Sequence, residues 1–277
     1  MLPRVDMVRT ETFDYLLFHC RDHISNVIRS GEQWGKTEIT LCRYLTTETE
    51  NAIVIDAGAN LGTFALPVAR HLDASGGRVY SFEPQRIVFQ QLCANVIVNS
   101  LGNVFAHNVA LGDDHGMIEI PELDFSSSQN IGGLSVDPAF RERIFADAEK
   151  GINIKNVVDG RYGNYKVRKI PLDSLELFEN VRFIKVDIEG WELEFFQGAV
   201  ETLRRNNFPP IVFELWPFEW YREKGRQTVA FLEDLGYRLT PFDREILAQH
   251  PAYERQLRFD GQSGKVSMDI RAERLSA

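Results

Sequence analysis

Apolar and polar residues follow two different periods along this chain. Short runs of β-branched and aromatic residues are typical of strands buried on both faces of a parallel sheet. Segments with an apolar residue at every third or fourth position are typical of helices. From about residue 51 the two kinds of segment alternate, which predicts a doubly wound α/β fold with a mostly parallel seven-stranded sheet and helices on both faces. Strands are predicted at 53–56, 78–83, 104–106, 181–186, 211–213 and 237–240, and helices at 61–72, 86–98, 191–203 and 227–235.

The chain before this core has a simpler pattern. Residues 10–29 repeat apolar side chains at helical spacing, with Thr10 as a possible cap. Residues 37–45 alternate in character and predict a strand. We therefore expect residues 1–50 to form a cap of one helix and one strand, which could cover the ligand site or pair with a second copy of the chain in a homo-oligomer.

Residues 51–250 are predicted to form the main domain, and an insertion at about 113–171 interrupts its rhythm. The insertion carries two alternating segments and a short charged helix at 138–150. Residues 251–277 are mostly polar and are expected to form a tail with one edge strand, which contains Val266, Met268 and Ile270.

A glycine turn between the first core strand and its helix suggests a ligand site. Gly58 and Gly62 flank the turn, where a backbone without side chains can approach a ligand closely. Their Gly-x-x-x-Gly spacing differs from the denser pattern of dinucleotide sites, and Asp56 would be unfavourable beside a pyrophosphate. Glu83 follows about 20 residues later, the spacing of an acid that accepts from ribose hydroxyls. This combination suits a nucleoside with a cationic or zwitterionic group, such as S-adenosylmethionine.

Five motifs in order resemble one known family. They are Asp56-Ala-Gly-Ala-Asn60-Leu-Gly62, Phe82-Glu83-Pro84, Asn95-Val-Ile-Val-Asn99, Val109-Ala-Leu-Gly112 and Lys185-Val-Asp187-Ile-Glu189-Gly190. Together they resemble the FkbM-type methyltransferases, from about Ile53 to Trp216. The resemblance implies a Rossmann-like methyltransferase sheet, S-adenosylmethionine as cofactor, and O-methylation of a hydroxyl on a sugar, glycan precursor or secondary metabolite.

The resemblance and the spacing together propose two groups of binding residues. The expected cofactor-binding residues are Asp56, Gly58, Asn60, Gly62, Glu83, Asn108 and Asp187. A long polar loop at 125–135 interrupts the insertion, and such loops are often functional. We expect substrate contacts from Asn130, Gly132 and Gly133 in this loop.

Carboxylates at the ends of predicted strands are the candidate catalytic groups. Asp187 and Glu214 each end a strand, and Glu189 follows shortly after the first. A carboxylate in a crowded acidic site can have its pKa raised, which suits a base that removes the acceptor's hydroxyl proton. His107 and His115 are alternative bases, and N-capping of the following helices is a structural alternative for the acids. The same three carboxylates could instead hold Mg²⁺ or Mn²⁺.

Composition narrows the class of protein. The net charge of −9 is unfavourable for nucleic-acid binding. No apolar run approaches the ~20 residues of a membrane span, and we see no signal peptide, so we expect a soluble cytoplasmic protein. The three cysteines show no zinc or disulfide spacing. Trp191, Trp216 and Trp220 could stack on a sugar, although core packing explains them as well.

Two other functions stay open at this point. One is a nicotinamide-dependent oxidoreductase on the same fold, against which Asp56 and the glycine spacing argue. The other is a non-catalytic ligand-binding or scaffold protein that shares the fold, because one fold hosts many functions.

Overall fold

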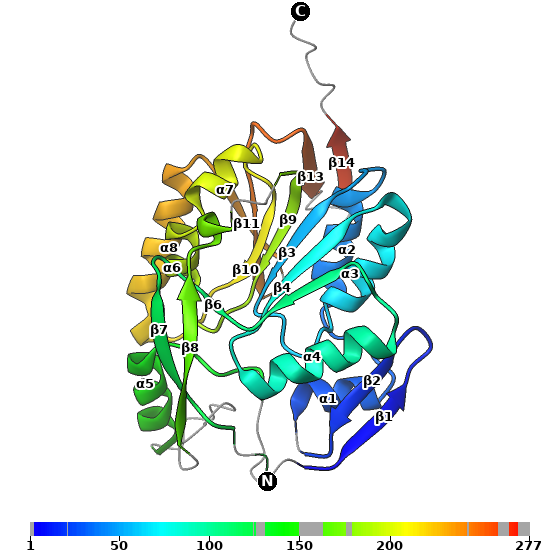
Figure 1. Ribbon diagram of the computed structural model, residues 1–277. Helices are drawn as coiled ribbons and strands as arrows, with labels where there is room; N and C mark the ends of the chain where they lie inside the picture. The colour runs from blue at the N-terminus through cyan, green and yellow to red at the C-terminus, as the bar shows by residue number, and fades with distance from the viewer. Residues whose placement is uncertain are drawn as a thin grey trace, which may run out of the picture.

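Figure 1 shows the computed structural model, which describes residues 3–20, 22–123, 125, 131–149, 163–175, 179–242, 244–259 and 266–270. Its centre is a seven-stranded sheet of order β11-β12-β10-β9-β3-β4-β5. The strands are β3 (Ile53–Ala57), β4 (Arg78–Phe82), β5 (Val104–His107), β9 (Val181–Val186), β10 (Ile211–Glu214), β11 (Arg238–Phe242) and β12 (Glu245–Gln249).

The sheet is parallel from β10 to β5, and β12 runs antiparallel to both β10 and β11. The predicted doubly wound, mostly parallel seven-stranded sheet is therefore confirmed. Strand β12 was not among the predicted elements, because its short apolar centre of Ile246, Leu247 and Ala248 follows β11 after only two residues.

Helices cover both faces of the sheet and make two cores (Figure 1). One face buries Val54, Val79 and Phe183 under helices of the first half of the chain. The other buries Ile55, Ile184 and Phe213 under helices of the second half. The helices are α2 (Lys36–Thr46), α3 (Ala65–Leu72) and α4 (Arg86–Val98) on the first face, and α6 (Glu192–Gln197), α7 (Val200–Arg205) and α8 (Arg222–Asp234) on the second. Short 3₁₀ turns lie at Asp73–Ser75, Leu172–Ser174 and Glu219–Tyr221.

The insertion forms a separate three-stranded sheet of order β6-β8-β7, beside the carboxyl ends of the central strands. Its elements are β6 (Ala110–Leu111), β7 (Gly116–Pro121), α5 (Pro138–Glu149) and β8 (Asn164–Ile170). Both predicted strands and the charged helix of the insertion are confirmed. The segment predicted as one helix over 191–203 is two helices, because Gly198 ends α6 and the chain restarts at Val200.

Two predictions for the N-terminal segment were wrong. Residues 10–29 contain the second strand of a hairpin, β1 (Val5–Arg9) with β2 (Asp14–Phe18), followed by a short helix, α1 (His23–Arg29). Thr10 binds the carbonyl of Phe13 in the hairpin turn instead of capping a helix. Residues 37–45 belong to the helix α2, because Ile39, Cys42 and Leu45 face one core at helical spacing.

The C-terminal edge strand forms, but elsewhere than expected. Strand β14 (Val266–Ile270) pairs antiparallel with β13 (Arg255–Phe259) in a two-stranded sheet of its own and does not extend the central sheet. Within the described residues, no helix has both the length and the apolar character needed to cross a bilayer.

Candidate active site

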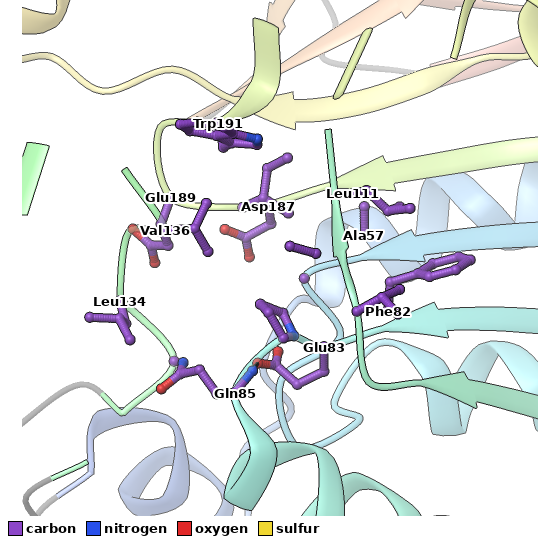
Figure 2. Close-up of a pocket in the computed structure, with 16 residues that line it drawn as sticks. Ala57, Phe82, Glu83, Gln85, Leu111, Leu134, Val136, Asp187, Glu189 and Trp191 are labelled. Atoms are coloured by element: carbon purple, nitrogen blue, oxygen red, sulfur yellow. Dashed lines mark hydrogen bonds between the residues drawn. The ribbon is translucent and has the colours of Figure 1, made fainter. Parts of the chain in front are cut away.

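A cavity opens at the carboxyl ends of β3, β4 and β9 (Figure 2). Ligands of doubly wound sheets bind at this edge. The cavity is lined by Ala57, Gly58, Phe82, Glu83, Pro84, Gln85, Val109, Ala110, Leu111, Gly132, Leu134, Val136, Asp187, Ile188, Glu189 and Trp191.

The glycine turn is packed too tightly for side chains. Gly58 has φ +81°, and a Cβ atom there would lie 1.8 Å from the carbonyl oxygen of Asp187. Gly62 has φ +99° and lies against Leu66 and Leu92, behind the cavity wall. The turn therefore brings bare backbone to the cavity only at Gly58, while Gly62 lets α3 and α4 approach each other.

Glu83 is held at one end of the cavity by the backbone on both sides of it. Its Oε2 accepts from the N–H of Asn60 at 2.9 Å, and its Oε1 accepts from the N–H of Gln85 at 2.8 Å. Burial raises the pKa of Glu83 to about 7, against the opposing effect of these two hydrogen bonds. Each carboxylate oxygen can accept more than one hydrogen bond, so both retain capacity for a ligand hydroxyl.

Lys185 is a buried cation shared by two carboxylates. Its Nζ lies 3.3 Å from Oδ2 of Asp187, 3.6 Å from Oδ1 of Asp56 and 3.3 Å from the carbonyl oxygen of Gly58. Burial raises the pKa of Asp56 to about 6, although the lysine opposes the rise. Burial would lower the pKa of Lys185, but Asp187 and Asp56 outweigh it and raise that pKa. The lysine thus stays charged under the glycine turn.

Glu189 lies across the cavity from Glu83 on an unusual turn (Figure 2). Glu189 and Gly190 both have positive φ, +57° and +91°. The N–H of Gly190 donates to Oε1 of Glu192 at 3.1 Å, and the hydroxyl of Tyr221 donates to Oε2 of the same residue at 2.8 Å. Burial, with the negative charges of Asp187 and Glu214, raises the pKa of Glu189 well above its ordinary value.

The predicted site residues divide between the cavity wall and the layer behind it. Gly58, Glu83, Gly132, Asp187 and Glu189 line the cavity. Asp56, Asn60, Gly62, Asn108, Gly133 and Glu214 do not. Asn130 lies outside the described residues.

Three of the residues behind the wall support it. Asn60 donates its backbone N–H to Glu83, and Asn108 donates its side-chain amide to the carbonyls of Glu83 and Pro84. Glu214 affects the site through its charge, which helps to raise the pKa of Glu189, while burial and Asp187 raise its own pKa to about 7. These three residues support the wall, but none of their side chains lines the cavity.

The geometry supports neither a histidine base nor a metal site at the cavity. His107 packs its ring on Phe82 with a pKa lowered by burial, His115 is exposed, and neither lines the cavity. Within the part of the chain that the structure describes, no three His, Cys, Asp or Glu side chains gather as ligands of one metal ion. This includes Asp187, Glu189 and Glu214.

Sequence reasoning gave no role to two residues at the site, Lys185 and Gln85. A lysine within the apolar run of β9 was a usable signal for the first, because a buried lysine requires charged partners. Gln85 carried no such signal, because a polar residue after a strand is common. Trp191, which the sequence offered as a possible stacking partner for a sugar, lines the cavity.

Comparisons with known proteins agree with this geometry. Residues 56–239 match the FkbM methyltransferase domain. The chain is 26% identical over 220 residues to methyltransferase sdnD of Sordaria araneosa, covering 72% of this chain and 78% of that protein. It is 22% identical to methyltransferase 1 of Beauveria bassiana, covering 58% of this chain and 63% of that one. A crystal structure of an FkbM methyltransferase from Methylobacillus flagellatus aligns with TM-score 0.44 and 17% identity, over 75% of this chain and 48% of its own.

The sheet order, the cavity at its carboxyl edge and the acid after β4 are those of a nucleotide-binding α/β fold. The family match places the chain in the S-adenosylmethionine-dependent methyltransferase class. The chain belongs to the FkbM methyltransferase family, whose domain spans about two thirds of it.

Proposed function

We propose that this chain transfers the methyl group of S-adenosylmethionine to a hydroxyl oxygen of a small acceptor, such as a sugar, a glycan precursor or a secondary metabolite. One observation carries the proposal: a single cavity has Glu83 at one end and Glu189 at the other, with Asp187 between them (Figure 2). The first carboxylate suits a ribose, and the second suits a hydroxyl that must lose its proton.

The residues present fit S-adenosylmethionine. Glu83 has spare acceptor capacity for the two ribose hydroxyls, and Gly58 offers bare backbone to the methionine part. The carboxyl groups that line or flank the cavity outnumber the one lysine, Lys185, so the local charge favours a cationic ligand. We assign Asp187 and Asp56, with Lys185 between them, to this charge balance.

When bound, S-adenosylmethionine supplies an electrophilic methyl group on a positively charged sulfur. The new bond joins the acceptor oxygen to the methyl carbon, the bond from that carbon to sulfur breaks, and its electron pair stays on sulfur. The hydroxyl proton passes to a carboxylate of this chain, for which we propose Glu189. Burial and the charges of Asp187 and Glu214 raise its pKa, which makes it a stronger proton acceptor than an ordinary carboxylate.

The acceptor side of the cavity is mostly apolar. Leu134 and Val136 form one wall and Trp191 another. Such a wall suits an acceptor with an apolar face or ring beside its hydroxyl. Asn130 and Gly133 stay predictions as further acceptor contacts.

Isothermal titration calorimetry with S-adenosylmethionine, S-adenosylhomocysteine and NAD tests the cofactor. We expect the first two to bind with micromolar dissociation constants and NAD not to bind. Glu83→Ala should weaken both by at least tenfold, because a charged partner of the ribose is lost. Glu254→Ala, a matched change on the distant surface beside Arg182, should leave binding unchanged. Binding of NAD alone would support the oxidoreductase instead.

Transfer of tritiated methyl groups to hydroxylated acceptors tests the chemistry. We expect Glu189→Gln to retain cofactor binding and to lose about 10²–10⁴-fold in kcat, the usual contribution of a positioned base. Loss of kcat without loss of cofactor affinity would separate the base from the binding residues. A wild-type protein that binds the cofactor and methylates no acceptor would favour the non-catalytic alternative.

A further inference from the structure

Residues 131–136, which we call the wall loop, close one side of the cavity. Gly132, Leu134 and Val136 line it. The loop belongs to no helix or strand, so its position must come from contacts with other parts of the chain.

Both backbone polar groups of Ile131 are held by buried side chains. Its N–H donates to Oδ1 of Asp22 at 3.1 Å, and its carbonyl accepts from Nε2 of Gln85 at 3.0 Å. Asp22 is 2% exposed and Gln85 is 3% exposed. A charged acceptor shielded from water makes a stronger hydrogen bond than an exposed one.

The next residue of the wall loop docks against the glycine turn. A Cβ atom at Gly132 would lie 1.8 Å from Nδ2 of Asn60, so the amide of Asn60 fills the space that a side chain would need. Asn60 in turn donates its backbone N–H to Glu83. The position of Ile131 is therefore linked, through two residues, to the acid proposed to bind the ribose.

Asp22 also caps a helix, and this role can be separated from its contact with Ile131. It is the N-cap of α1, where its Oδ2 accepts from the backbone N–H of Ser25 at 2.8 Å and from the hydroxyl of that residue at 2.6 Å. Only Oδ1 reaches across 109 positions of the chain to Ile131. Asp22 also lies before residues 56–239, which match the family.

We propose that Asp22 is a positioning residue of the active site, which fixes the wall loop through Ile131 and so preserves the shape of the cofactor cavity. This inference rests on the proposed function, because it takes the cavity to be the cofactor site. The proposal gives the part of the chain before residue 56 a role in ligand binding.

The substitution Asp22→Ser tests the proposal. Serine caps helices about as well as aspartate but its side chain is too short to reach Ile131 as well. We expect the apo protein to melt near the wild-type temperature and to bind S-adenosylhomocysteine about tenfold more weakly, a change of about 1.4 kcal/mol. Hydrogen–deuterium exchange of a peptide covering residues 131–136 should become faster. Ser25→Ala, which leaves Oδ1 of Asp22 in place, is the matched control and should match wild type in affinity and in exchange.

Three results would overturn the proposal. The first is wild-type affinity and wild-type exchange in Asp22→Ser. The second is a melting temperature as low as that of Asp22→Ala, which would assign Asp22 to folding alone. The third is an unprotected amide of Ile131 in the wild-type protein. If wild type itself does not bind S-adenosylhomocysteine, the proposed function fails and this inference fails with it, whereas equal binding by wild type and Asp22→Ser removes this inference only.

Discussion

At the scale of single residues, the turn after β9 concentrates unusual features. Glu189 adopts a positive φ, which is uncommon for residues other than glycine and costs on the order of 1 kcal/mol or more. Glu192 stabilises the turn by accepting a hydrogen bond from the N–H of Gly190, and the hydroxyl of Tyr221 donates to Glu192 and holds it in place. The strain lies at the proposed base itself, where a fixed carboxylate direction matters most.

We expect Glu192→Gln to make the protein less sensitive to pH. Burial raises the pKa of Glu192 from 4.5 to about 7 in the folded protein. A raised carboxyl pKa means that the folded state binds the proton more tightly, so stability is lost as pH rises from about 4.5 through 7. Glutamine has the same shape and stays neutral. The variant should therefore exceed wild type in free energy of unfolding by on the order of 3 kcal/mol at pH 8 and by about 1 kcal/mol or less near pH 5.

Urea denaturation at the two pH values measures this difference. Glu223→Gln, an exposed change on α8, is the control and should alter neither value by more than about 0.5 kcal/mol. A Glu192→Gln variant less stable than wild type at pH 8 would contradict a buried, costly charge at this position.

Sequence reasoning reached some of these residues and not others. Glu83 and Asp187 were found because each directly follows an apolar run, and the ends of parallel strands meet at one edge. Asp22 and Gln85 were not found, since their partner Ile131 is far away in the chain. A hydrogen bond across 109 residues leaves no local pattern.

At the scale of elements, α4 docks the N-terminal hairpin through side-chain amides. Gln91, Asn95 and Asn99 are spaced one helical turn apart, and each bonds to the backbone of β2. Asn95, fully buried, also donates to the carbonyl of Leu61 in the glycine turn at 2.9 Å. These three amides, which we call the amide ladder, satisfy the backbone groups along one edge of β2 as a neighbouring strand would. Through Asn95 the amide ladder also connects β2 to the glycine turn.

This arrangement predicts different results for two similar substitutions. Asn99→Ala removes bonds to Asp14 and to the carbonyl of Asn95 and none to the glycine turn, so it should lower the free energy of unfolding by about 1–3 kcal/mol and leave cofactor affinity unchanged. Asn95→Ala should cost a similar amount of stability and also weaken S-adenosylhomocysteine binding several-fold, because the Leu61 carbonyl loses its donor. Urea denaturation and calorimetry on both variants measure the two effects. Wild-type affinity for S-adenosylhomocysteine in both variants would show that the amide ladder serves stability alone.

The amide ladder also explains why the prediction of a helix over residues 10–29 was wrong. Residues 13–28 do repeat apolar side chains at helical spacing, and an isolated segment with this pattern favours a helix. Pairing with β1 and with the amides of α4 makes residues 14–18 a strand instead. A helical pattern of apolar residues does not decide the structure where tertiary contacts satisfy more of the backbone hydrogen-bonding groups. The core strands were predictable, because the unbroken apolar character of each run indicates burial on both faces.

At the scale of the whole molecule, parallel topology brings acids from distant positions to one edge. Asp56, Glu83, Asp187 and Glu214 lie at the ends of four neighbouring strands, and Lys185 is the buried cation that pairs with two of them. The parallel character of the sheet was predictable from the alternation of strands and helices, whereas the shape of the cavity depends on the insertion and the N-terminal segment. The excess of negative charge is a property of the assembled sheet, and it has a measurable consequence.

We expect S-adenosylmethionine to bind more tightly as pH rises from about 5.5 to 8. Burial raises the pKa of Asp56 to about 6 and those of Glu83 and Glu214 to about 7, so these groups are partly protonated near neutrality. A cationic ligand favours their ionised forms and displaces protons, and each proton released changes affinity by about tenfold per pH unit. Calorimetry in buffers with different heats of ionisation counts these protons.

S-adenosylhomocysteine is the matched control, because it shares the ribose, the amino group and the carboxylate but lacks the positive sulfur. Its affinity should rise less steeply with pH, and it should release fewer protons on binding. Because the amino group is common to both ligands, a difference between them reports chiefly the response of the cavity to the sulfonium charge. Identical slopes for the two ligands would mean that the carboxylates do not sense the sulfur. That result would contradict the electrostatic role proposed for Asp56 and Asp187 while leaving the ribose contact of Glu83 intact.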